Sequence, residues 1–132
     1  MLTPPSSPPP TVTIEVDVGQ PVVRIYFRGK VTAASMRGHA DALQAVVSKL
    51  GSGFTLVTDL SDLREMEIDT IGEITRVMDL CLTAGVKKIV RVIPDPSKDI
   101  GFHLLSMTHY RGRVPIVIHA TAAEAERELS KD

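Results

Sequence analysis

Apolar segments of two different periods alternate along this chain, and this alternation limits the folds that it can adopt. The segment "TVTIEVDV" places an apolar residue at every second position, which is typical of a strand with one buried face. Four more strand-like segments lie at residues 22–31, 54–60, 86–93 and 114–120. Segments with the three-and-four spacing of an amphipathic helix lie at residues 32–50 and 70–84. Further helices are expected at residues 98–110, after a Ser97 cap, and at residues 122–131. The order ββαβαβαβα predicts an α/β fold with a largely parallel sheet.

Local signals refine these elements. The Gly19-Gln20-Pro21 turn predicts that the first two strands form an antiparallel hairpin. Thr32 is expected to cap the first helix, and Gly85 lies where a C-terminal cap glycine belongs after the second. The inward stripe expected for the second helix consists of Ile71, Ile74, Met78, Cys81 and Leu82.

The composition indicates a single globular domain. The chain has 132 residues, of which 43% are apolar and only 4% aromatic, so the core must be built from aliphatic side chains. Residues 1–11 are rich in proline and serine and are expected to be a disordered tail, which leaves residues 12–132 as the folded domain. A net charge of −1 argues against a nucleic-acid binder.

Three features bear on the compartment. No apolar run approaches the roughly 20 residues that span a bilayer, so membrane insertion is not expected. The segment "MLTPPSSPPP" lacks the basic region and the apolar core of a signal peptide. A single cysteine, Cys81, excludes an intrachain disulfide and fits a reducing compartment. We therefore expect a cytoplasmic protein.

The segment "LVTDLSDLREMEIDTIGEI" resembles the STAS domain family, which includes bacterial anti-sigma factor antagonists. Asp59-Leu60-Ser61 matches a segment that family members carry close to the end of their third strand. Asp69 and Gly72 match the two ends of the tetrapeptide that begins the next helix in the family. The element order from about residue 12 onward agrees with a STAS-like mixed, largely parallel sheet of about five strands with four helices packed on it.

This resemblance implies a protein-binding signalling module that takes part in partner switching. It would bind an anti-sigma factor or another kinase-like regulatory protein through the start of the helix near residue 70. The family's phosphoacceptor is usually the hydroxyl residue directly before the glycine, and that position is Ile71 here. The resemblance therefore implies partner binding through Asp69, Thr70, Ile71, Gly72 and Glu73, with phosphoregulation altered or absent.

The same residues allow three interpretations. Thr70 followed by Glu73 fits a capping box, with Asp69 near the positive end of the helix dipole. An exposed Thr70 hydroxyl would instead be a phosphorylation site, where added charge would release a docked partner. Alternatively, Ile71 would be an exposed apolar side chain that makes a constitutive contact.

Residues 87–113 suggest a second kind of function, the binding of a small anion, nucleotide or lipid headgroup. They contain six basic residues, among which Lys98, Arg111 and Arg113 are the candidate contacts. The loop of residues 94–99 lies between a strand and a helix, where α/β folds bind ligands. A structural subunit that self-associates is the third alternative.

Catalysis is not expected. The chain has no hydrolase nucleophile elbow, no dinucleotide fingerprint and no Walker loop. His103 and His109 are six residues apart and would lie on different helix faces, and Cys81 falls on a buried stripe. We therefore predict no metal, no cofactor and no enzymatic activity.

Overall fold

The computed structural model describes residues 11–94 and 113–130, and its centre is one five-stranded sheet in the order β1-β2-β3-β4-β5. The first pair of strands is antiparallel and the other three pairs are parallel, which confirms the predicted mixed, largely parallel sheet. The strands are β1 (Val12–Asp17), β2 (Val22–Val31), β3 (Thr55–Met66), β4 (Lys88–Val92) and β5 (Ile116–His119).

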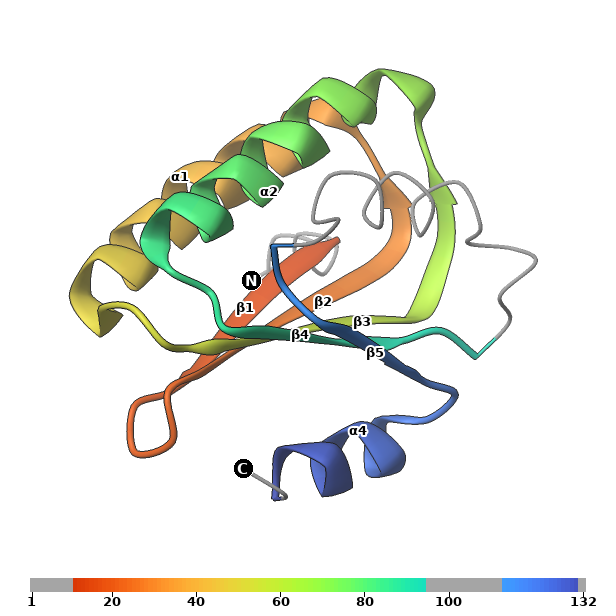
Figure 1. Ribbon diagram of the computed structural model, residues 1–132. Helices are drawn as coiled ribbons and strands as arrows, with labels where there is room; N and C mark the ends of the chain where they lie inside the picture. Colours follow the sequence, from red (N-terminus) through yellow and green to blue (C-terminus); the bar gives the residue numbers. More distant parts are fainter. Residues whose placement is uncertain (1–10, 95–112, 131–132) are drawn as a thin grey trace, which may run out of the picture.

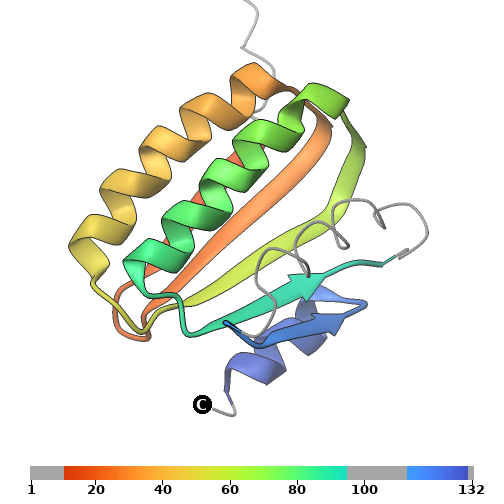
Figure 2. The same ribbon diagram turned by 45° about the horizontal axis from the view of Figure 1, so that its top comes forward.

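Helices cover both faces of this sheet. The long helices α1 (Ala33–Leu50) and α2 (Ile71–Ala84) lie side by side on one face, and the short α4 (Ala122–Leu129) lies on the other (Figure 1). Seen from a second direction, α1 and α2 still run next to each other over the sheet (Figure 2). The described residues hold three α-helices where four were expected, because the predicted helix at residues 98–110 lies outside them.

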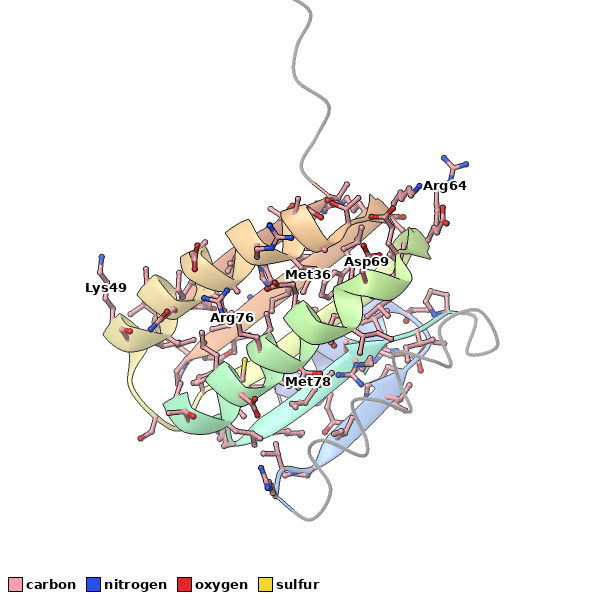
Figure 3. The ribbon with its side chains drawn as sticks, turned by 90° about the horizontal axis from the view of Figure 1, so that it is seen from above. Met36, Lys49, Arg64, Asp69, Arg76 and Met78 are labelled. Atoms are coloured by element: carbon pink, nitrogen blue, oxygen red, sulfur yellow. The ribbon has the colours of Figure 1, made fainter. Side chains whose placement is uncertain are left out.

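Mostly aliphatic side chains from both layers fill the main core, as the composition predicted. Ile25 of β2 and Phe54, just before β3, are buried in it. Met36 of α1 and Met78 of α2 join it from the helix layer (Figure 3). A second, smaller cluster joins α4 to the opposite face of the sheet. Its members are Val22, Val57, Val90, Val92, Ala125 and Leu129. Burial on both faces explains why β3 and β4 carry nearly continuous apolar runs.

The caps predicted at Thr32 and Gly85 are both confirmed. Thr32 caps α1, since its Oγ1 accepts a hydrogen bond from the Ser35 N–H at 3.2 Å and Ser35 Oγ accepts one from the Thr32 N–H at 3.0 Å. Gly85 ends α2 in the left-handed conformation, with φ of 91°. A Cβ at Gly85 would lie 2.6 Å from Ser52 Cβ, so close packing as well as φ requires glycine here.

The first strand is less buried than its alternating pattern suggests. Val12 and Ile14 pack against the core, but Val16 is 38% exposed and Val18 is 77% exposed. β1 is the edge of the sheet and ends at Asp17, whose carboxylate accepts hydrogen bonds from the next turn. Val18 therefore belongs to that turn, and the apolar alternation runs past the end of the strand.

Candidate functional site

β3 reaches the start of α2 later than predicted, because it runs through Met66 instead of ending near residue 60. Its pairing with β4 stops at Asp59, opposite Val92. Beyond that point, among the described residues, β3 pairs with β2 alone, across two register shifts. The Asp59 carboxylate accepts a hydrogen bond from the Ser61 N–H at 2.8 Å. The Asp-Leu-Ser segment therefore lies inside the strand, where β4 leaves it, and not close to the strand's end.

The chain passes from β3 into α2 through a short 3₁₀ turn, Ile68–Thr70. Thr70 has the helical backbone angles φ −72° and ψ −15°, and its side chain is fully buried. Its Oγ1 and its N–H both donate hydrogen bonds to the carbonyl oxygen of Glu67. The expectation of an exposed Thr70 hydroxyl is therefore wrong.

The expected capping box between Thr70 and Glu73 is also wrong, and the backbone gives the reason. A side chain reaches the first-turn N–H groups from an N-cap residue with extended φ and ψ, as at Thr32. Thr70 is already helical, so its hydroxyl turns back toward the preceding turn and makes no cap hydrogen bond.

Three residues of the predicted site are exposed at the start of α2, namely Asp69, Ile71 and Gly72. Ile71 is 48% exposed, so its placement on the inward stripe of the helix is wrong. Ile74, two residues further on from Gly72, is buried as predicted. A Cβ at Gly72 would meet nothing within 4 Å, so the surface beside Ile71 is open.

Glu73 joins the start of α2 to α1. Its Oε1 lies 3.2 Å from Arg37 Nε of α1, and its Oε2 lies 3.7 Å from Arg76 Nη1 one turn along α2. Arg76 lies between the two helices in Figure 3, where its Nη2 donates to Asp41 Oδ1 at 3.1 Å. These partners on α1 were not predicted, because no local pattern tells which residues of two separate helices meet.

Two basic residues in the described part of the segment 87–113, Lys88 and Arg91, have partners within the fold. Lys88 Nζ lies 2.7 Å from Glu128 Oε2 of α4, so its charge is neutralised. Arg91 is 1% exposed in the middle of β4, and its Nε donates to Thr58 Oγ1 at 3.0 Å. Neither of these two residues therefore adds to an exposed basic surface.

Of the three residues considered for anion binding, only Arg113 is described, and it is exposed. Lys98 and Arg111 lie outside the described residues, as does the loop after Pro94. The anion-binding alternative therefore stays a prediction.

The cysteine and the two described histidines, His39 and His119, are at least partly buried. Cys81 is fully buried, as predicted. His119 lies partly buried, with Nε2 3.1 Å from Glu128 Oε1. Burial lowers the pKa of His39 to about 4, and its ring packs edge-on against Phe27. Within residues 11–94 and 113–130, no three His, Cys, Asp or Glu side chains are placed to hold a metal.

No helix in the described part of the chain combines the length and apolar character needed to cross a membrane. No protein-family model matches the sequence, and no characterised protein matches it by sequence. Solved structures, in contrast, match almost the whole chain.

The anti-sigma factor antagonist SpoIIAA in its unphosphorylated form superposes with a TM-score of 0.64 at 15% identity, covering 92% of this chain and 99% of that one. The chain has the SpoIIAA-like STAS fold. An anti-sigma factor antagonist from Mycobacterium paratuberculosis shares this fold, with a TM-score of 0.58 at 18% identity over 95% of this chain and 99% of that one. So does a DUF3478 protein from Shewanella loihica PV-4, with a TM-score of 0.65 at 11% identity over 89% of this chain and 91% of that one.

The STAS fold confirms the resemblance that the Asp-Leu-Ser segment and the element order suggested. A fold can support many functions, so the role of the α2 start must be argued from its own residues.

Proposed function

We propose that this protein is a non-enzymatic STAS-like module that binds a protein partner through the exposed start of α2. The partner would be an anti-sigma factor or another kinase-like regulatory protein, as for the anti-sigma factor antagonists that share the fold. The observation that carries this proposal is Ile71, a large apolar side chain that is 48% exposed at a helix start.

The surroundings of Ile71 have the composition of a small protein interface. Such interfaces place an apolar or aromatic contact at the centre and polar groups around it. Ile71 is flanked by the exposed carboxylate of Asp69 and by the open surface at Gly72. Glu73 brings two charged side chains close to this surface, Arg37 of α1 and Arg76 one turn further along α2.

The start of α2 is also held in place before any partner arrives. The Thr70 side chain is buried and bonded to the Glu67 carbonyl, and Glu73 is paired with arginines from both helices. A surface ordered in advance loses less conformational entropy on binding, which favours affinity.

We infer that this contact is constitutive. Isoleucine cannot be phosphorylated, and the hydroxyl of Thr70 is buried under the helix start. A kinase could reach Thr70 only after the 3₁₀ turn and the first turn of α2 had opened. Phosphorylation of Thr70 thus stays a prediction that requires local unfolding.

Affinity capture from a lysate of the source organism tests this proposal. Wild-type protein, Asp69→Ala and Ile71→Asp are immobilised in parallel, and captured proteins are quantified by mass spectrometry. Val18→Asp is the matched control, because Val18 is exposed in the β1–β2 turn, at the opposite end of the molecule from the start of α2 (Figure 1).

We expect one stoichiometric partner that is retained by wild type and Val18→Asp and depleted by both variants at the helix start. Capture that is equal for all four proteins would contradict a docking role for this surface.

A further inference from the structure

The outer edge of β1 has backbone groups available for another strand. β1 is the last strand of the sheet, and in the described residues it pairs only with β2. The Arg28 N–H donates to the Thr11 carbonyl at 2.8 Å, which fixes the residues whose backbone faces β2. Backbone direction alternates along a strand, so Val12, Ile14 and Val16 direct their N–H and C=O groups toward the open edge.

A groove of about 770 Å³ follows this edge, between β1 and α1. The three residues of β1 whose backbone faces the open edge have apolar side chains that line this groove. Across from them, α1 contributes small residues at every fourth position. These residues are Val12, Ile14 and Val16 of β1 and Ala34, Gly38 and Ala42 of α1. A Cβ at Gly38 would meet nothing within 4 Å, so there is room over the strand for further side chains.

His39 is an independent sign that the groove takes an occupant. It lines the groove and is only 5% exposed, yet neither Nδ1 nor Nε2 has a hydrogen-bond partner. A neutral imidazole has one donor and one acceptor, and leaving both unsatisfied when buried is unfavourable. A turn of the His39 ring toward the groove would let a polar side chain there satisfy one of them.

The other face of β1 indicates the charge of the occupant. Glu15 and Asp17 are exposed there, and neither forms an ion pair with the described residues. A second copy of β1 would add two more carboxylates to the seam. A strand with lysine or arginine on this face would instead make favourable cross-strand pairs.

We propose that an extended peptide segment of a protein partner adds to β1 as one further strand of the sheet. Its side chains would alternate between small apolar or hydroxyl residues in the groove and basic residues over Glu15 and Asp17. Strand addition of this kind derives its affinity from backbone hydrogen bonds and its specificity from alternate side chains. The surface is separate from the start of α2, so Ile71 variants should leave it unchanged.

The probe is a labelled, end-capped peptide about seven residues long, enough to span β1. Lysine occupies its odd positions, and valine, threonine and valine occupy the even positions that face the groove. One control peptide replaces lysine by glutamate, and another replaces both valines by proline, which removes their N–H groups. Fluorescence anisotropy with the full-length protein gives each Kd.

Three protein variants locate the site. Gly38→Leu fills the groove at a position where leucine favours the helix, and Val16→Pro removes an outward N–H from an edge strand that tolerates proline. Ala45→Leu is the control, at an exposed position of α1 outside the groove. We expect Gly38→Leu and Val16→Pro each to weaken binding about tenfold or more, and Ala45→Leu to leave it unchanged.

The proposal predicts that only the lysine peptide without proline binds wild type, and that His39→Leu binds the threonine peptide less tightly. Equal binding of the control peptides, unchanged binding by Gly38→Leu, or no binding at millimolar peptide would overturn it. Concentration-dependent dimers that Val16→Pro abolishes would overturn it as well, because they would assign the edge to a second copy.

Discussion

The helices α1 and α2 both follow a threonine, but the two threonines make different contacts. Thr32 has extended backbone angles, φ −111° and ψ 164°, and forms a reciprocal capping box with Ser35. Thr70 has helical angles and bonds back to the carbonyl of Glu67. The start of α1 is therefore closed by its own side chains, whereas the Thr70 side chain makes no cap hydrogen bond at the start of α2.

This difference shows that the backbone before a helix, and not the threonine itself, decides what the helix start can do. At α1 the hydroxyl stabilises the helix. At α2 the 3₁₀ turn buries Thr70 and exposes Ile71. No Thr70 side-chain cap therefore covers the positive end of the α2 dipole.

The largest effect should come from placing aspartate at each threonine. Thr70→Asp puts a carboxylate at a fully buried position, and we expect it to destabilise the fold by about 3 kcal/mol. Thr32→Asp should be nearly neutral, because aspartate is a good N-cap residue. Urea denaturation of both variants measures this contrast, and equal losses at the two positions would refute it.

Lowering the pH should destabilise the fold through protonation of His39 in α1. Its pKa in the fold is about 4, below the unfolded value of 6.5, so its neutral form is the one that the fold favours. That contribution is complete above the unfolded pKa and is lost as the pH falls toward the folded pKa. We expect a loss of about 2 kcal/mol between about pH 7 and about pH 5.

Replacing His39 by leucine should flatten this part of the pH profile of unfolding free energy. If the stability of His39→Leu falls with pH as steeply as that of wild type, the pH dependence comes from other groups and the prediction is wrong.

Substitution by valine should separate the two threonines more finely. Thr32→Val loses the cap, and we expect a cost of about 1 kcal/mol. Thr70→Val keeps the buried shape, and the Glu67 carbonyl still accepts the Thr70 N–H at 3.0 Å, so its cost should be smaller. Thermal and urea unfolding of the pair provide the measurement; a larger loss at Thr70 would mean that its hydroxyl stabilises the turn more than we infer.

The smallest effect is expected at Glu73, whose arginine partners are partly exposed. Glu73→Gln should cost about 0.5 kcal/mol or less, since solvent and salt screen such pairs. The difference from wild type should shrink further when unfolding is repeated in high salt. A loss that is large and independent of salt would show that Glu73 has a structural role beyond these pairs.

The elements and the sheet could be predicted because each depends on local patterns. Period two marked β1, period three and four marked α1, and Gly85 marked the end of α2. The contacts of Thr70 could not be predicted in this way. The capping-box pattern in the sequence carries no information about φ and ψ at the threonine, which here follow from the long β3 and the 3₁₀ turn.

The exposure of Ile71 has a similar explanation. A helical stripe places it near Ile74, and only the position of α2 against the sheet shows that the first turn extends beyond the core. The pairing of Glu73 with Arg37 and the groove at Gly38 likewise depend on how α1 packs, which the helix period leaves open.

The most direct test uses the captured partner after purification. Isothermal titration calorimetry measures its affinity for wild type and for Ile71→Ser, with Val18→Ser as the control. Docking through Ile71 predicts a Kd for Ile71→Ser that is about tenfold higher or more, and an unchanged Kd for Val18→Ser. An Ile71→Ser protein that binds as tightly as wild type would contradict the claim that the start of α2 is the docking surface.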